Sequence, residues 1–67
     1  MTKEEFRKTW KKFLIDIGLS ETQLSKEIGQ SQNNLNKKIV NGSIRYIELA
    51  DIVEKFGYTI EIRKKSE

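Results

Sequence analysis

The sequence predicts an all-α protein, a compact domain of four short helices that includes a helix-turn-helix, followed by a C-terminal β-strand. Three observations predict this fold. Apolar residues recur at helical spacing through most of the chain, four glycines divide it at intervals of about one helix, and only the last segment alternates apolar and polar residues. The 67 residues suffice for one domain. We assign residues 1–57 to the helix-turn-helix unit and residues 58–67 to the strand and a basic tail.

The first helix is expected from about Thr2 to Ile17. Thr2 and Glu5 have the spacing of a capping box, and Gly18 follows as a candidate C-cap. The apolar residues at the spacing of one helical face, which we expect to lie in the core, are Phe6, Trp10, Phe13, Leu14 and Ile17.

A second helix is expected from about Glu21 to Ile28. Ser20 is a good N-cap, and Gln23 completes a second capping box. Leu24 and Ile28 share the face that we expect to point inward.

A third helix is expected over about residues 32–40, after the N-cap candidate Ser31. Leu35 and Ile39 face inward, and an Asn-Gly pair then predicts a turn. A fourth helix is expected from Ile44 or Arg45 to Phe56. Its apolar residues recur at about every third position, namely Ile44, Ile47, Ala50, Val53 and Phe56, with Leu49 and Ile52 beside them.

The segment Tyr58–Arg63 alternates apolar and polar residues, which predicts a half-buried strand. Since no other segment has this pattern, its backbone groups need a partner, and we expect an antiparallel copy in a homodimer with two-fold symmetry. Tyr58, Ile60 and Ile62 would line one face, packed on the first and fourth helices, with Ile60 favoured opposite the partner's Ile62. The alternative is a frayed basic tail over residues 63–65.

The composition excludes several function classes. The chain has no cysteine and no histidine, so disulfides, thiolate metal sites and histidine-based acid–base catalysis are excluded. We expect no enzyme activity, no metal, no cofactor and no small-molecule ligand. No apolar run approaches the roughly 20 residues of a membrane span, and we expect a cytoplasmic protein without a membrane partner. Residues 1–45 carry nine basic and five acidic side chains, whereas residues 46–67 carry four and five.

Only Gly29, Gln30 and Ser31 separate the second and third helices, which is the connection of a helix-turn-helix unit. The second helix of such a unit can lie in the major groove of double-stranded DNA. No carboxylate lies between Gly29 and Glu48, which suits an approach to phosphates.

At about 100° per residue, Asn33 and Lys37 fall opposite the inward face of the third helix. Amide side chains can pair with adenine, and lysine reaches guanine or phosphate. The expected base-reading residues are Gln32, Asn33, Asn36 and Lys37. The expected phosphate contacts are Thr22, Gln23, Ser31, Lys38, Asn41, Ser43 and Arg45. A solvated polar face is the alternative, although three asparagines in one short helix are costly.

The stretch 18–42, GLSETQLSKEIGQSQNNLNKKIVNG, resembles the Cro/C1-type (XRE) helix-turn-helix family of phage and plasmid repressors. The positions that match are Leu19, Leu24, Ser25, Ile28, Gly29, Ser31, Gln32, Leu35, Ile39 and Gly42. The resemblance implies a lambda-repressor-like fold and operator recognition by a dimer. Glu21 departs from it, because the family commonly has glutamine there to contact phosphate, so this contact is not carried over.

Two functions remain open. One is a sequence-specific transcriptional regulator, in particular a small Cro-like repressor. The other is a protein-binding module of the same fold, such as an antitoxin or a phage-encoded inhibitor of host defence. The neutral, polar third helix and Glu21 beside it are compatible with the second.

Overall fold

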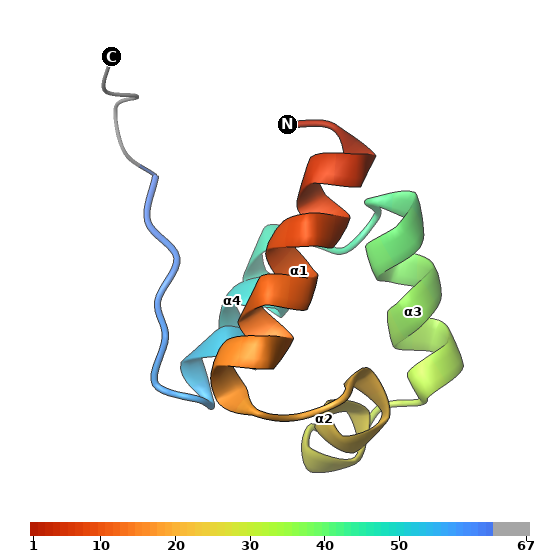
Figure 1. Ribbon diagram of the computed structural model, residues 1–67, viewed down its shortest axis with the longest axis vertical. Coiled ribbons are helices and arrows are strands. Elements are labelled where there is room, and N and C mark those ends of the chain that lie inside the picture. Colours follow the sequence, from red (N-terminus) through yellow and green to blue (C-terminus); the bar gives the residue numbers. More distant parts are fainter. Residues whose placement is uncertain (63–67) are drawn as a thin grey trace.

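The computed structural model describes residues 1–62, which form four α-helices and no strand, so the all-α class is confirmed (Figure 1). The helices are α1 (Lys3–Ile17), α2 (Glu21–Glu27), α3 (Gln32–Asn41) and α4 (Tyr46–Glu54).

The N-terminal ends of α1 and α2 are closed by the two predicted capping boxes. The Thr2 hydroxyl accepts from the Glu5 N–H at 3.0 Å, and the Glu5 carboxylate accepts from the Thr2 N–H at 3.1 Å. The bond from the Thr2 N–H to the carboxylate, together with the nearby Thr2 side chain, holds the pKa of Glu5 below its ordinary value. Ser20 and Gln23 make the same pair of bonds at 3.1 and 2.9 Å. Each box satisfies backbone donors that the first helical turn leaves unpaired.

The C-terminal ends of α1 and α3 depend on glycine. Gly18 and Gly42 adopt left-handed backbone conformations, with φ of 71° and 65°. In this geometry the chain reverses and the next residue donates back into the helix, as the Ser43 N–H does to the Lys38 carbonyl at 2.9 Å. A side chain at φ near +65° is strained, so glycine is the suitable residue.

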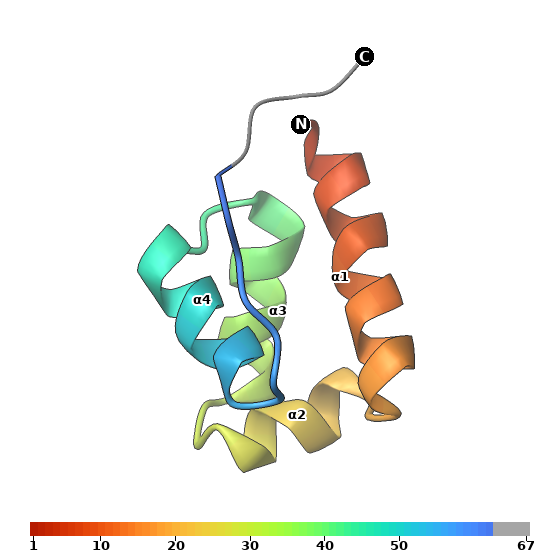
Figure 2. The ribbon, with the colours of Figure 1, turned by 90° about the vertical axis from the view of Figure 1, so that its left-hand side faces the viewer.

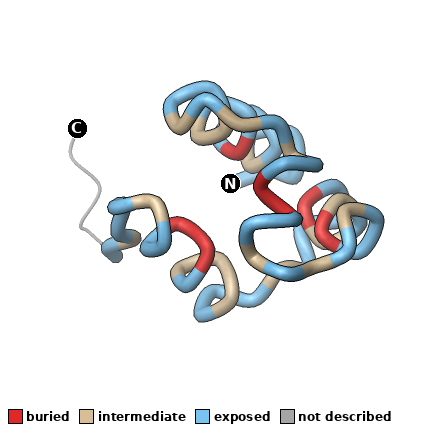
Figure 3. Tube along the Cα trace, turned by 90° about the horizontal axis from the view of Figure 1, so that it is seen from below, coloured by how far each residue is buried: buried red, intermediate tan, exposed pale blue. Residues whose placement is uncertain are grey.

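The core lies between the helices, and each helix contributes at least one buried residue (Figure 3). Its most buried members are Trp10, Leu24, Leu35, Ile39 and Ile52. Partly buried apolar side chains surround them, namely Phe6, Phe13, Leu14, Ile17, Ile28, Ile44, Leu49 and Phe56. α3 packs against both α1 and α2. The predicted inward faces of the first three helices are confirmed.

The fourth helix is shorter than predicted. Arg45 has extended backbone angles and is the N-cap, so α4 begins at Tyr46. It ends at Glu54 because residues 55–57 form a tighter turn, in which the Phe56 N–H donates to the Val53 carbonyl at 3.1 Å. The apolar periodicity also includes Ile47, yet this side chain is 70% exposed.

The expected strand is not formed over residues 58–62, and Arg63 lies outside the described residues. A strand requires a second strand for its hydrogen bonds, and residues 1–62 provide none. The segment instead turns back after α4 and runs extended on the side away from α3 (Figures 1 and 2). The Tyr58 ring meets the Phe13 ring edge-on at 5.1 Å, and Ile60 is partly buried. Ile62, expected on the same packed face, is 90% exposed.

The two serine N-caps differ in a way that stability measurements can detect. Ser20 caps α2 with its hydroxyl, whereas Ser31 occupies the N-cap position of α3 without a side-chain cap bond. We expect Ser20→Ala to lower the free energy of unfolding by about 1 kcal/mol. The matched change Ser31→Ala should leave it nearly unchanged. Urea unfolding followed by circular dichroism measures both, and equal losses would contradict the capping geometry.

Candidate nucleic-acid interface

The turn between α2 and α3 is fixed by local bonds and by a small buried side chain. Gly29 has φ of 70°, and the Gln30 N–H donates to the Ser25 carbonyl at 2.9 Å. Ser25 is almost fully buried, and its hydroxyl donates to the Thr22 carbonyl at 2.7 Å, so its polar group is satisfied. Leu24 and Leu35, both completely buried, belong to the same core cluster and join the two helices. The pair therefore has a defined helix-turn-helix connection.

The outer face of α3 presents part of the predicted base-reading set. Asn33 and Lys37 are exposed, and Gln32 is partly buried at the first position of the helix. Since Ser31 makes no side-chain cap bond, it leaves the N–H groups of the first turn uncapped. The N-terminal end of a helix carries partial positive charge and free donors, which favours an anion.

Asn36, the fourth predicted base reader, is partly buried and held by α2. Its Nδ2 donates to the Glu21 carboxylate oxygens at 3.3 and 3.5 Å. These distances are at the long end for a hydrogen bond, so the contact is weak. It nevertheless places a carboxylate beside one flank of α3. Glu21 is the position where the sequence departs from the Cro/C1-type pattern.

On the other flank, Lys38 forms an ion pair with α4. Its Nζ lies 2.6 Å from Oε2 of Glu48, and the two side chains are 38% and 24% exposed. The hydrogen bond from Lys38 holds the pKa of Glu48 below its ordinary value. The ammonium group of Lys38, which was expected to contact phosphate, is therefore already paired with a carboxylate of the same chain.

The structure brings together three of the seven expected phosphate contacts. Lys38, Ser43 and Arg45 line one shallow hollow beside the end of α3, which Glu48 and Asp51 also line. Thr22 and Gln23 lie apart from it in α2, where the Gln23 side-chain oxygen is used by the capping box. The remaining two lie at opposite ends of α3, Ser31 as its N-cap and Asn41 as its last residue.

The sequence indicated Glu21 beside α3, but it did not indicate Glu48. Residues 30–47 contain no carboxylate, yet the fold places one acidic side chain against each flank of α3. The departure at Glu21 was a usable signal. The pairing of Lys38 with Glu48 spans the turn into α4 and left no pattern in the sequence.

Comparison with known proteins identifies no relative. No family model matches the chain, and neither the curated proteins nor the solved structures contain a match. Within residues 1–62, no helix combines the length and apolar character needed to cross a membrane. The same residues bring together no group of three or more acidic side chains that would hold a metal ion.

The Lys38–Glu48 pair predicts a pH effect. Because the folded-state pKa of Glu48 is lowered, its contribution to stability is present above the unfolded pKa and is lost as pH falls through the folded value. We expect Lys38→Met to raise the pKa of Glu48 toward its ordinary value, as followed by NMR titration of the carboxyl carbon. Lys37→Met, which changes the neighbouring lysine, should not. An unchanged Glu48 titration in Lys38→Met would contradict the pairing.

Proposed function

We propose that this protein binds double-stranded DNA sequence-specifically and regulates transcription, as a Cro-like repressor that inserts α3 into the major groove. The observation that carries the proposal is the pairing of α2 and α3 through a short, hydrogen-bonded turn, with the polar outer face of α3 free of packing. The major groove admits one helix, and a second helix then braces it against the backbone.

Asn33 and Lys37 are the base-reading residues that this arrangement supports best, because both are exposed opposite the buried Leu35 and Ile39. Gln32 is at the helix end that enters the groove first. Asn36 contributes to base reading under a constraint, because its side-chain NH₂ group also donates to Glu21. It contacts a base either in a geometry that keeps the bond to Glu21 or after this bond has broken.

Phosphate binding would require a local exchange of partners. Lys38 must leave Glu48, or bridge it, to reach a phosphate. Arg45 and Ser43 beside it are exposed and join the same contact. Glu21 and Glu48 reduce the positive field around α3, so we expect moderate nonspecific affinity and a comparatively large share of binding from base contacts.

A protein-binding module is the second candidate, and the same two carboxylates favour it. With Glu21 and Glu48 against its flanks, α3 presents a surface of mixed charge rather than a basic stripe. Such a surface suits a protein partner as well as it suits phosphate. The absence of DNA binding at low salt would select this candidate.

The proposed DNA-binding form is a homodimer joined through residues 58–62. A second copy would supply the neighbouring strand that residues 1–62 do not provide. Ile62, 90% exposed in the single chain, would be covered in the dimer. The two recognition helices would then meet two half-sites of a palindrome.

For DNA binding, a target sequence is first selected from a random duplex pool. We expect the logarithm of the association constant for this sequence to fall by about 0.9 per neutralised phosphate for each tenfold rise in salt concentration.

Asn33→Ala should cost about 1–3 kcal/mol of binding free energy on the selected sequence and relax discrimination at one base pair. Asn34→Ala is the matched control, since Asn34 is exposed on the flank and is not assigned to a base. Equal effects of the two changes would show that the assigned face is wrong.

For the dimer, we expect Ile62→Asp to convert it to a monomer at tens of micromolar in sedimentation velocity and to weaken operator binding. The change should leave the single-chain fold intact, because Ile62 is exposed there. Ile15→Asp is the matched control, an equally drastic change at an exposed position of α1 that leaves the dimer in place. An unmodified chain that sediments as a monomer would refute this assembly.

A further inference from the structure

The two most exposed large apolar side chains of the helices are isoleucines on different sides of the molecule. Ile15 of α1 is 78% exposed, and Ile47 of α4 is 70% exposed. A single exposed isoleucine is ordinary on a protein surface and indicates nothing by itself. These two are informative because of the charged residues that accompany each of them.

On α1, Ile15 ends a row of exposed residues that we call the basic stripe. Its members lie three and four positions apart along the chain and are Lys8, Lys11 and Ile15. At about 100° per residue they fall within about 60° of one another, so they share one face of the helix. Both lysines are exposed, and neither forms an ion pair within residues 1–62. Glu4 and Arg7 beside them have opposite charges, so this face of α1 stays basic.

On α4, Ile47 begins a second row of exposed residues, the acidic stripe. Its members lie four and three positions apart and are Ile47, Asp51 and Glu54. They share one face of the helix in the same way. Neither of the two carboxylates forms an ion pair in the described part of the chain, and both residues are exposed. Glu48 and Lys55 flank the stripe with opposite charges, so this face of α4 stays acidic.

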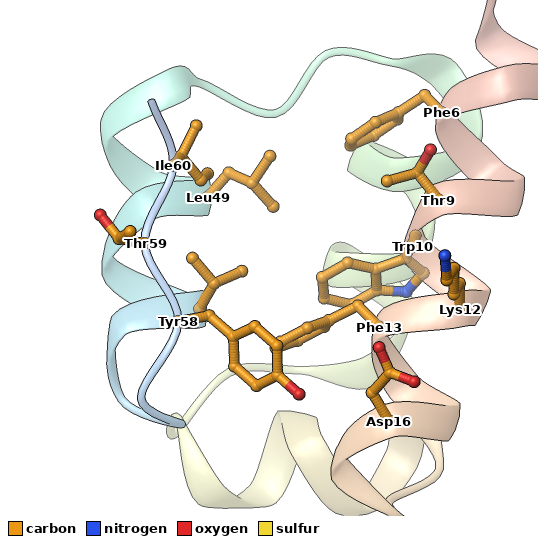
Figure 4. A pocket seen from close by; sticks show the side chains of 11 residues that line it. Phe6, Thr9, Trp10, Lys12, Phe13, Asp16, Leu49, Tyr58, Thr59 and Ile60 are labelled. Carbon is orange, nitrogen blue, oxygen red and sulfur yellow. The ribbon is translucent and has the colours of Figure 1, made fainter. Parts of the chain in front are cut away.

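The two stripes cannot meet within one chain. The other side of α1 carries Phe6, Trp10 and Phe13, which point toward Leu49 of α4 (Figure 4). The two helices therefore turn their apolar sides toward each other, and Figure 2 shows them on opposite sides of the molecule. Since their exposed sides point apart, a contact between the stripes requires a second molecule.

The stripes match when the two helices lie antiparallel. Their spacings run in opposite order along the chain, and both stripes are about 10 Å long. Turning one helix end for end therefore aligns every member. The contacts that result are Ile15 with Ile47, Lys11 with Asp51, and Lys8 with Glu54. Beside Ile15, a shallow apolar hollow lined by Leu14 and Leu19 offers further room for Ile47.

We propose that α1 of one molecule binds α4 of a second copy of this chain through these two stripes, antiparallel and head to tail. The isoleucines cover each other, and the opposite charges fix the register and the direction. In a parallel arrangement only the central pair of Lys11 and Asp51 would remain. The partner is a copy of this chain because its own α4 supplies the complementary charges at the matching spacing.

This contact differs from the proposed dimer. Each molecule uses one face for one neighbour and a different face for the next, so the contact is heterologous and does not close on a pair. It uses no residue of the segment 58–62. It is also weak, because exposed ion pairs contribute little and two short helix faces are smaller than a standard interface. Ile47 and Asp51 border the hollow that holds Lys38 and Arg45, so the test uses protein without DNA and does not depend on the proposed function.

Cysteine trapping tests the contact directly, because the chain contains no cysteine. The variants Ile15→Cys and Ile47→Cys, one of them labelled with ¹⁵N, are mixed in equal amounts and oxidised with copper phenanthroline. Mass spectrometry then separates the mixed disulfide from the two symmetric ones. We expect the mixed disulfide to form several-fold faster than either symmetric product. Ile15→Cys mixed with Val40→Cys, an exposed position of α3, is the control and should give the proportions of random pairing.

A charge exchange between the two molecules tests the register. Lys11→Glu in the Ile15→Cys chain should reduce the mixed disulfide to the random proportion, since it sets a like charge against Asp51. Asp51→Lys in the Ile47→Cys chain should then restore the excess. Lys26→Glu, the same change at an exposed position of α2, is the control and should leave the excess unchanged. All the substituted positions are exposed, and circular dichroism checks that each variant keeps its helices.

Three results would overturn the proposal. One is a random proportion of products from the first mixture. Another is an excess of mixed disulfide that persists with Lys11→Glu alone, which would show that the opposite charges do not hold the contact. The third is a dominant symmetric product, which would show that like faces meet.

Discussion

The contact between α2 and α3 around Leu24 and Leu35 is the interaction on which the rest of this structure depends. Both side chains are completely buried, and Ser25 beside them is small enough to let the helices approach and has its hydroxyl bonded internally. Buried methyl groups contribute most of the stability in so small a domain. The same contact determines which face of α3 points outward, so a change in this packing also changes which side chains α3 exposes.

Much of the fold could be predicted because its signals are local. The capping box at Thr2 and the glycine after α3 act within one helical turn, and the sequence shows them directly. The absence of a strand over residues 58–62 and the exposure of Ile47 were less predictable. The alternation over residues 58–62 does not indicate whether another strand is present to pair with them. On α4, the apolar residues are too many for the neighbouring helices to cover all of them, so Ile47 stays exposed.

The candidate site could be predicted only in part, for a related reason. Helical geometry located Asn33 and Lys37 on the exposed face, because their position follows from the buried residues of the same helix. The state of Asn36 and Lys38 depends on Glu21 and Glu48, which approach from other helices. Long side chains that meet across elements leave no periodic pattern. The distribution of charge around α3 therefore follows from the tertiary arrangement of the helices and not from the sequence pattern of α3 alone.

The local character of these contacts also bears on how fast the protein folds. The N-terminal ends of α1 and α2 and the C-terminal ends of α1 and α3 are closed by residues within a turn of them, and few contacts join positions far apart in the chain. Domains with such low contact order fold in about microseconds to milliseconds. Rapid folding shortens the time during which exposed apolar segments can aggregate. A chain with only modest stability can thus recover its native form quickly after each transient unfolding.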